Sequence, residues 1–422
     1  MAKVKLTLTF LLINFITLVV FSACAVSKLV YVGFCSDGII IVNPGQLINE
    51  TLYTANDGDT ILVKSGNYSE SGILVNKSVT IVGENAENTI IDGGGTTQDI
   101  FHVIANNVVI ENFTLQNTSS TTFPPAPAAR MFNVANVTLQ KIVLKSVGYG
   151  VEIWSSNFTE IRYSRIFNAT TGIMIRRNSY NNTVVDNTLE NNSIAISIAD
   201  NTCNYNKIFH NNFVNNKNPS SNLGSSNFFD NGYPSGGNYW NDYNASDLKS
   251  GPYQNETGSD GILDEAYPDP SSEWDRYPLA HPITNIEVIA HGNRFMVHVS
   301  TNSTITAYNF NQSAGSLTSF VNGPANTNGS CRIAVPKGLL AAESLDNWTI
   351  LLYDDGGEKA TPQWILDDTE NTYIYFTYSH AFTSRIEIVV AEHTSILTLI
   401  FLASTLTLIT FKKRLKSQRP KS

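Results

Sequence analysis

Pairs of apolar residues five positions apart recur along residues 107–216, and successive pairs begin 29, 22, 23 and 24 residues apart. The pairs are Ile110/Leu115, Leu139/Leu144, Ile161/Ile166, Val184/Leu189 and Ile208/Phe213. A second apolar series keeps the same phase: Phe132/Val134, Val151/Ile153, Ile173/Ile175 and Ile196/Ile198. Alternation within each short run predicts a strand, and the fixed period predicts similar units. Each unit is too small to bury its apolar face alone, so neighbouring units must stack.

Two repeat architectures have a period of this length. A leucine-rich repeat requires an L-x-x-L-x-L-x-x-N frame and a helical half, and neither occurs here. Short strands separated by polar turns are typical of a parallel β-helix, whose single turn of the coil we call a rung. One polar column falls seven residues after the start of each pair: Asn117, Ser146, Asn168, Asn191 and Asn215. We expect these residues to occupy left-handed rung corners and to form a ladder of stacked amides.

The segments Asn181-Asn-Thr-Val-Val-Asp-Asn-Thr-Leu189 and Asp57-Gly-Asp-Thr-Ile-Leu-Val63 resemble the NosD-like right-handed parallel β-helix family. The resemblance covers roughly residues 38–283. It implies a carbohydrate-binding or sugar-hydrolysing coil, and its motifs indicate the architecture much better than the substrate. We therefore expect an all-β chain whose residues 26–226 form a right-handed parallel β-helix.

Earlier strands of the coil are expected between glycine- and asparagine-containing turns. They are residues 60–63, 72–75, 79–82, 89–91 and 101–104. Residues 26–49 are expected to cover the open end of the coil, because an uncovered rung invites edge pairing. The insertion Ser119–Ala129 contains three prolines, which disfavour a ladder strand and predict a protruding loop that ends beside Arg130.

Alternation in Val151-Glu-Ile-Trp154 directs Glu152 and Trp154 outward. Met174 and Arg176 match them on the next rung, and His102 and Asn133 are expected in the column of Glu152. A flat aromatic ring beside charged groups and a loop wall is a common way to hold sugars. The predicted ligand-binding residues are Trp154, Glu152, Arg176, Arg130 and His102. The alternative is that Trp154 packs under the loop while Arg176 pairs with Glu152.

Catalysis on the coil has weaker support. Hydrolases that resemble polygalacturonases need clustered aspartates, a Gly-His and an Arg-x-Lys, and the predicted strands contain none of these. β-Helix lyases use an Arg or Lys base near carboxylate-bound calcium. Arg130, Arg162, Arg165, Arg176 and Arg177 are suitable in kind, but no acidic cluster on consecutive rungs accompanies them. A polysaccharide lyase or glycoside hydrolase is therefore the alternative to non-catalytic binding.

Residues 227–283 change in character and are expected to cap the coil. Three motifs resemble the segments that close NosD-like coils in archaeal surface proteins: Gly237-Asn-Tyr-Trp-Asn-Asp-Tyr243, Ser259-Asp-Gly-Ile-Leu-Asp-Glu265 and Asp275-Arg-Tyr-Pro-Leu279. Tyr239, Trp240 and Tyr243 are expected to cover the last apolar rung.

The second of these motifs also resembles part of a calcium loop. It predicts a calcium site at Asp260, Asp264 and Glu265, although a solvated acidic turn is the alternative. Copper, which the family name suggests, is not expected, because the seven histidines are scattered along the chain and the methionines are few.

Residues 284–392 predict seven alternating strands, the pattern of a β-sandwich. The strands are expected at 286–290, 294–299, 303–310, 330–335, 348–353, 373–378 and 385–391. The segments Gly329–Leu340 and Tyr373–Tyr378 resemble an immunoglobulin-like module common beside the membrane in archaeal surface proteins. No catalytic arrangement is evident there, so a spacer or adhesion role is expected.

The two ends of the chain predict export and anchoring. Residues 1–25 have the charged start, apolar run and Ala23-Cys-Ala25 site of a signal peptide; an acylated Cys24 and an uncleaved anchor are the alternatives. Residues 394–411 are uncharged and long enough to span roughly 27 Å as a helix at about 1.5 Å per residue. The basic tail 412–422 follows, which predicts a cytoplasmic C-terminus and an extracellular bulk.

The composition of the chain limits the kinds of molecule that it is expected to bind. The net charge is −9, and since both terminal segments are purely basic, the remainder is more acidic still, which argues against a nucleic-acid partner. The four cysteines have no metal-ligand spacing, so buried thiols are expected. More than a dozen N-x-S/T sequons suit an exported glycoprotein. The sequence thus predicts a cell-surface protein that binds polysaccharides or surface glycans, with an enzyme or a structural envelope stalk as alternatives.

Overall fold

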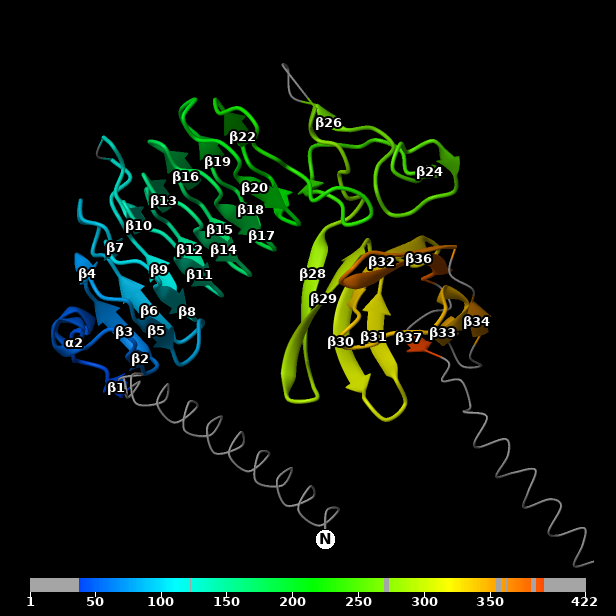
Figure 1. Cartoon of the computed structure of the whole chain (residues 1–422), viewed down its shortest axis with the longest axis horizontal. Coiled ribbons are helices and arrows are strands. Elements are labelled where there is room, and N and C mark those ends of the chain that lie inside the picture. The colour runs from blue at the N-terminus through cyan, green and yellow to red at the C-terminus, as the bar shows by residue number, and fades with distance from the viewer. Residues whose placement is uncertain are drawn as a thin grey trace, which may run out of the picture.

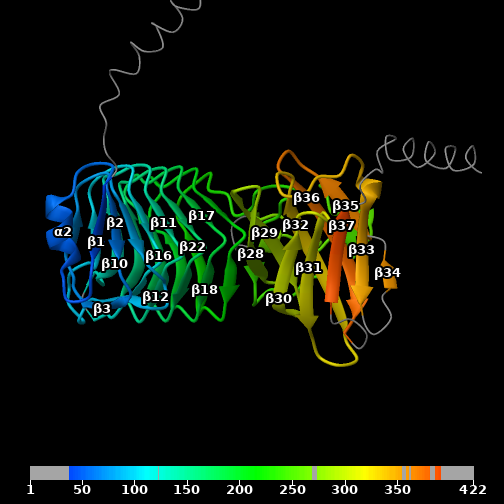
Figure 2. The same cartoon turned by 90° about the horizontal axis from the view of Figure 1, so that it is seen from below.

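The computed structural model describes residues 38–121, 123–268, 273–353, 358–360, 363–380 and 385–390. The predicted export segment (1–25) and membrane span (394–411) lie outside these ranges. Within them, no helix combines the length and apolarity that a membrane span requires. The described part is all-β apart from two short helices, and it contains a parallel coil followed by antiparallel sheets (Figures 1 and 2).

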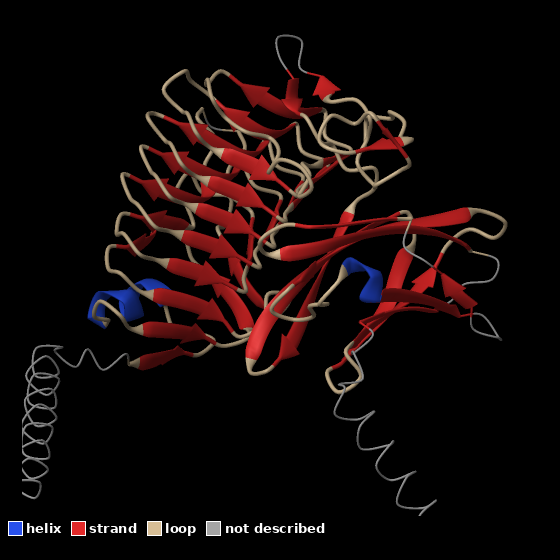
Figure 3. Cartoon of the chain, turned by 45° about the vertical axis from the view of Figure 1, so that its right-hand side comes forward, coloured by secondary structure: helices blue, strands red, loops and turns tan. Residues whose placement is uncertain are grey.

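Three parallel sheets build the coil, and each rung contributes one strand to each sheet (Figure 3). The first sheet contains β1 (Ile39–Val42), β2 (Thr60–Val63), β5 (Thr80–Gly83), β8 (Val109–Glu111), β11 (Thr138–Gln140), β14 (Glu160–Arg162), β17 (Thr183–Val185) and β20 (Lys207–Phe209). The second contains β3 (Gly66–Ser69), β6 (Thr89–Asp92), β9 (Thr114–Gln116), β12 (Val143–Lys145), β15 (Arg165–Phe167), β18 (Thr188–Glu190), β21 (Asn212–Val214) and β23 (Tyr239–Trp240). The third contains β4 (Ile73–Val75), β7 (Phe101–Val103), β10 (Pro127–Phe132), β13 (Tyr149–Trp154), β16 (Thr171–Arg176), β19 (Ile194–Ile198) and β22 (Asn218–Asn222).

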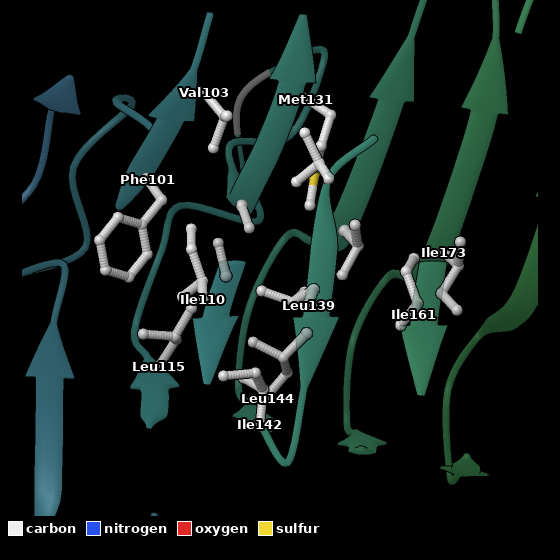
Figure 4. Close-up of a cluster of buried hydrophobic side chains, with 14 of the residues drawn as sticks. Phe101, Val103, Ile110, Leu115, Met131, Leu139, Ile142, Leu144, Ile161 and Ile173 are labelled. Carbon is white, nitrogen blue, oxygen red and sulfur yellow. The ribbon is translucent and has the colours of Figure 1, made fainter. Parts of the chain in front are cut away.

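The apolar pairs that define the period lie inside this coil. Ile110, Leu139 and Ile161 are aligned on the first sheet, and Leu115 and Leu144 are aligned on the second. All of these side chains are fully buried and pack into one continuous core (Figure 4). The predicted parallel β-helix is confirmed.

The predicted phase of the third sheet is wrong at β10. Ala129 and Met131 pair with Val151 and Ile153 and face inward, whereas Phe132 pairs with Trp154 and is exposed. Val134 is buried in the core but lies beyond the end of the strand. The strand begins inside the insertion, at Pro127, because proline is tolerated at the first position of a strand. The insertion changes which residues of this rung face the core, and the length of the shift cannot be read from its sequence.

The five predicted corner residues are confirmed in their backbone conformation. Asn117, Ser146, Asn168, Asn191 and Asn215 have φ between 52° and 62°, and all are exposed. The amide ladder predicted for them lies instead at neighbouring positions that point back into the coil. Its members are buried except for Asn216 and Asn227, which are half-buried. They form three columns: Asn182/Asn206/Asn227, Asn187/Asn211/Asn238 and Asn192/Asn216.

Both ends of the coil are covered. At the first end, helix α2 (Ile48–Thr54) buries Ile48 and Leu52 against the core, while β1 forms part of the first rung. At the second end, the Trp240 ring stacks between Phe213, with ring centroids 4.2 Å apart, and Tyr267, at 4.1 Å. The predicted cap is therefore confirmed at Trp240.

The rest of the cap segment contains short antiparallel pairs. Tyr243 packs against the same core, and Tyr239 is half-buried within β23. The paired strands are β24 (Lys249–Ser250) with β25 (Glu256–Thr257), and β26 (Tyr267–Pro268) with β27 (Glu273–Asp275).

Two five-stranded antiparallel sheets follow and share a second apolar core, so the predicted antiparallel strands are confirmed. Three of the ten strands were not predicted: Ser316–Asn322, Glu358–Ala360 and Trp364–Asp367. The immunoglobulin-like resemblance stays a prediction. One sheet contains β28 (Ile283–Ala290), β29 (Asn293–Thr301), β32 (Asn328–Pro336), β36 (Asn371–Ser379) and β35 (Trp364–Asp367). The other contains β30 (Thr304–Asn311), β31 (Ser316–Asn322), β37 (Arg385–Val390), β33 (Trp348–Tyr353) and β34 (Glu358–Ala360), with the short helix η1 (Leu345–Asn347) before β33.

The sandwich docks on the coil along the corner between the first and second sheets, and on the cap. Asn212 exchanges two hydrogen bonds with the backbone of Ile283, at 2.8 and 2.9 Å. Lys141 of the coil forms a 2.6 Å ion pair with Glu287 of β28. The hairpin β28–β29 consequently lies between the coil and the remaining sandwich strands (Figure 1).

Candidate functional site

The outer surface of the third sheet brings together all five predicted ligand-binding residues. His102, Arg130 and Glu152 form one column, since β7, β10 and β13 pair in that register. Phe132, Trp154 and Arg176 form the next column. Asn133 does not join the first column, because Arg130 occupies the position predicted for it. With Asp99, these six residues define what we call the Trp154 face.

Glu152 points away from the core, as predicted, but it is fully buried rather than exposed. Arg130 Nε lies 2.6 Å from its Oε2, and Arg176 Nη2 contacts its Oε1. The two guanidinium groups therefore cover the carboxylate from both neighbouring rungs. Burial raises the pKa of Glu152, and the charges of Arg130 and Arg176 oppose that rise.

Asp99 extends this network toward the first rungs. Its carboxylate lies 3.2 Å from Arg130 Nη2 and 2.7 Å from His102 Nδ1. Asp99 itself is nearly buried, whereas the His102 side chain is 30% exposed. A chain of alternating basic and acidic side chains thus runs from His102 to Arg176 across four strands, and only its basic members are accessible to a ligand.

Aromatic rings lie beside this chain of charges. The Arg176 guanidinium lies 4.0 Å from the centre of the half-buried Trp154 ring, and Phe132 meets that ring edge-on at 5.7 Å. His102 stacks on Phe132 at 6.0 Å. The Trp154 face therefore presents ring edges and guanidinium N–H groups side by side on rigid strands, an arrangement able to contact both the apolar and the hydroxyl parts of a sugar.

The proline-rich loop does not wall this face, contrary to the prediction. It enters β10 at Pro127, which pairs with Tyr149, whereas Trp154 pairs with Phe132 at the other end of the strand. The loop residue Ser120 instead lines a separate groove of about 390 Å³ at the corner between the second and third sheets. Its other walls are polar corner residues, including Ser146, Asn168 and Asn191.

A larger cavity lies elsewhere, between the coil and the hairpin β28–β29. Its volume is about 530 Å³. It is lined mainly by charged and polar side chains, among them Glu111, Gln140, Arg162, Glu287 and Arg294. Sequence reasoning missed this cleft because its two walls are more than a hundred residues apart in the chain.

The predicted calcium residues have partners within the protein. Asp264 accepts hydrogen bonds from the backbone N–H groups of Leu248 and Lys249, and Asp260 accepts one from Ile262. Glu265 is exposed. A further carboxylate, that of Asp247, lies beside this loop and accepts hydrogen bonds from the backbone N–H groups of Asp260 and Gly261. Calcium binding at Asp260, Asp264 and Glu265 stays a prediction, which calorimetric titration with Ca²⁺ would test.

Gly261 in the same motif has a clear packing role. Its φ is +85°, and a Cβ atom there would lie 2.7 Å from Cβ of Arg332 in β32. Arg332 is nearly buried and donates a 2.7 Å hydrogen bond to the carbonyl of Asp260. The glycine thus permits the close approach of the cap and the sandwich.

A cluster that the sequence did not predict lies between the coil and the sandwich. Among the described residues, Asp186, His210 and His298 are the one group of three potential metal ligands whose donor atoms all lie within 4.8 Å of one another. Burial lowers the pKa of both histidines to about 4 and raises that of Asp186 to about 6. The spacing of Asp186 and His210, one rung apart, was a usable signal; the approach of His298 from another domain was not.

The chain belongs to the family described as periplasmic copper-binding protein (NosD), which matches residues 33–245, half of its length. The match begins ahead of β1 and ends in the cap segment, so it covers the described coil. No curated protein matches the chain.

Several solved β-helix enzymes are weakly similar. The catalytic domain of a GH87 α-1,3-glucanase in complex with nigerose is 17% identical with a TM-score of 0.38, covering 49% of this chain and 39% of its own. A pectin methylesterase in complex with a hexasaccharide is 13% identical with a TM-score of 0.28, covering 39% and 67%. An alginate lyase from Paenibacillus sp. is 11% identical with a TM-score of 0.20, covering 49% and 99%. None of these likenesses assigns an activity to the chain.

The family description names copper, so the donors that the described residues offer bear on it. Cys203 and Cys331 are buried, free thiols, as expected, and neither belongs to a group of three potential ligands. Burial raises their pKa values, to about 11 and about 12 respectively. The cluster at Asp186 supplies nitrogen and oxygen, which suit a divalent ion, whereas Cu(I) prefers sulfur.

Proposed function

We propose that this chain is a membrane-anchored, extracellular β-helix protein that binds glycans without chemistry, through the Trp154 face. The observation that carries the proposal is the column Phe132, Trp154 and Arg176 beside the side chains of Arg130 and His102. Parallel strands hold these side chains at fixed spacing, so little ordering is required when a ligand binds.

The chemistry of the face suits a polysaccharide chain. Part of the guanidinium group of Arg130 and of Arg176 is paired with Glu152, and the two side chains remain 22% and 19% exposed, respectively. Their other N–H groups can donate to hydroxyl or carboxylate oxygens of a sugar. The edges of Trp154 and Phe132 offer apolar contact to the C–H groups of the ring.

A lyase or hydrolase is the second candidate. Its support is that two carboxylates, Asp99 and Glu152, meet on this face and share Arg130. Both carboxylates are held by basic partners and neither is freely exposed, which favours binding over acid–base chemistry. Release of reducing ends or unsaturated products from acidic polysaccharides would establish the enzyme instead.

The test is binding to a panel of glycans, measured by array and by affinity electrophoresis, for the natural chain and for Trp154→Ala. We expect the substitution to weaken binding about tenfold, since loss of aromatic contact worth roughly 1.4 kcal/mol corresponds to that factor. Tyr53→Ala is the matched control, because Tyr53 is an 87% exposed aromatic on the terminal helix α2. Equal binding by the natural chain and Trp154→Ala, with both folded, would rule out this face.

A structural stalk is the remaining alternative. It predicts that the natural chain binds no glycan in either assay. Extracellular exposure and anchoring rest on residues 1–25 and 394–422 of the sequence, and the whole-molecule experiment described in the Discussion tests them.

A further inference from the structure

Asp186 and His210 occupy the same corner on neighbouring rungs of the coil. Asp186 follows β17 and His210 follows β20, and both have left-handed backbones with φ of 59° and 55°. His298 approaches from β29 of the sandwich, where it pairs with Asn285 of β28. Three side chains able to bind metal therefore converge from two separately folded parts of the chain.

The hydrogen bonding of His210 determines which of its nitrogens faces the cluster. Nε2 lies 3.0 Å from the backbone carbonyl of Ser235, which can only accept, and 3.2 Å from its hydroxyl oxygen, which can also accept, so we assign the hydrogen to Nε2. The lone pair of Nδ1 is consequently directed at the interior, where Asp186 Oδ1 lies 4.0 Å away. Metal-bound histidines are held in this manner, with the second nitrogen donating to a carbonyl.

This arrangement leaves two buried acceptors facing each other. Neither Asp186 Oδ1 nor His210 Nδ1 has a hydrogen-bond partner, and their side chains are 4% and 9% exposed. At 4.0 Å they are too far apart for a direct hydrogen bond. Two buried lone pairs without a proton between them are costly, and a cation placed between them removes that cost.

The dimensions suit a small ion. His298 Nε2 lies 3.6 Å from Asp186 Oδ2. Metal bonds of about 2.0–2.2 Å place two tetrahedral ligands roughly 3.3–3.6 Å apart, so the pair at 3.6 Å already fits and the pair at 4.0 Å has to close by about half an ångström. The donor atoms of all three residues lie within 4.8 Å of one another.

Asn285 offers a further oxygen beside the cluster. Its Nδ2 donates a 3.3 Å hydrogen bond to the backbone carbonyl of Asp186, and its Oδ1 is buried without a hydrogen-bond partner. Three buried polar atoms in one small region thus lack partners in the described part of the chain. That concentration is unusual in a native interior, where such groups are nearly always satisfied.

We propose that Asp186, His210 and His298 bind one divalent transition-metal ion, of which Zn²⁺ fits best, and that this ion fastens the sandwich to the coil. Zn²⁺ has no geometric preference of its own and accepts imidazole and carboxylate ligands equally. Calcium requires six or more oxygens, which this cluster does not supply. The proposal is independent of glycan binding, since the Trp154 face lies on a different sheet.

The test is calorimetric titration of the full chain with Zn²⁺ after dialysis against chelator, together with thermal unfolding. We expect one Zn²⁺ per chain and a melting temperature that rises by roughly 3 °C at a hundredfold excess over Kd. Asp186→Asn, His210→Ala and His298→Ala should each weaken binding at least about tenfold. His291→Asn, at the exposed tip of the same hairpin, is the control and should leave the titration unchanged.

Several outcomes would overturn the proposal. Absence of Zn²⁺ heat in the natural chain would assign the gap to water. Zn²⁺ binding that persists unchanged in all three variants would place the ion elsewhere, and Ca²⁺ binding in place of Zn²⁺ would exclude a transition metal. Binding of Cu²⁺ to these residues would support the same site, because Cu²⁺ binds a given set of nitrogen and oxygen ligands more tightly than Zn²⁺ does. The electron paramagnetic resonance spectrum of Cu²⁺ should then show coupling to nitrogen that is lost in His298→Ala.

Discussion

Asparagine serves the coil in two ways at neighbouring positions. The exposed corner residues, such as Asn191, adopt left-handed backbone conformations that most residues disfavour. The next residue, here Asn192, turns inward and donates both to the carbonyl of Ile166 and to Asn216 on the following rung. One asparagine therefore shapes the corner, and the other satisfies buried backbone groups that the corner leaves without a strand partner.

Asn211 is the best place to measure the second role. Its Nδ2 contacts the carbonyls of Val184 and Phe209, and its Oδ1 accepts from Asn187. We expect Asn211→Ala to lower the free energy of unfolding by about 2–4 kcal/mol, because several buried partners lose their hydrogen bonds at once. Denaturant unfolding measures this change. Asn201→Ala, at an exposed turn, is the control and should change stability by less than about 0.5 kcal/mol.

Glu152 shows why burial at a single position escaped sequence reasoning. Alternation correctly places its side chain outside the core, but the arginines that cover it come from the preceding and following rungs. Whether an outward carboxylate is exposed or enclosed depends on the side chains aligned with it on neighbouring rungs. For Glu152 that alignment depends on the residue at which β10 begins. The position of Pro127 in a strand was not evident, since prolines predict loops.

Among the elements, the strands of regular rungs were the most predictable. Ile161 and Ile166 lie on two strands joined by a short corner, and their spacing alone fixes which sides face the core. Trp240 was equally predictable as a cap, because a large ring near the last rung needs an apolar surface. Contacts between elements far apart in sequence, such as His298 with Asp186, leave no local pattern.

The hairpin β28–β29 contributes an ion pair to docking, and this pair predicts a pH dependence. Its hydrogen bond with Lys141 lowers the pKa of Glu287, with Arg294 adding to the effect. A carboxylate whose pKa is lower in the folded protein stabilises the fold at pH values above its pKa in the unfolded chain, here 4.5. That contribution is lost as the pH falls through the pKa of the folded protein.

Glu287→Gln tests this interpretation. We expect it to cost roughly 0.5–1 kcal/mol of unfolding free energy at pH 7, the usual range for a partly exposed pair, and progressively less as the pH falls below 4.5. The difference between variant and natural chain, measured by denaturant unfolding across this range, gives the answer. A difference that stays constant with pH would show that the ion pair does not contribute through the charge of Glu287.

The coil and the sandwich have separate apolar clusters and are joined by polar contacts of Asn212 and Lys141. The cap is joined to the sandwich by the hydrogen bond of Arg332 and by a small apolar cluster of Ile262, Leu279 and Ile283. Such a junction is rigid only while its hydrogen bonds and ion pairs are intact. A metal ion at Asp186 would therefore have most effect at this scale, on how firmly the two parts hold together.

Anchoring is the prediction that belongs to the entire chain. If residues 394–411 span a membrane with the tail 412–422 inside, deletion of 394–422 should move the protein from the membrane fraction to the medium, because no other span is expected after export. Ultracentrifugation followed by immunoblotting measures the distribution. Retention of the deleted chain on membranes would contradict the prediction and would indicate that residues 1–25 anchor the protein. The substitution Cys24→Ser would then distinguish an acylated Cys24 from an uncleaved apolar segment.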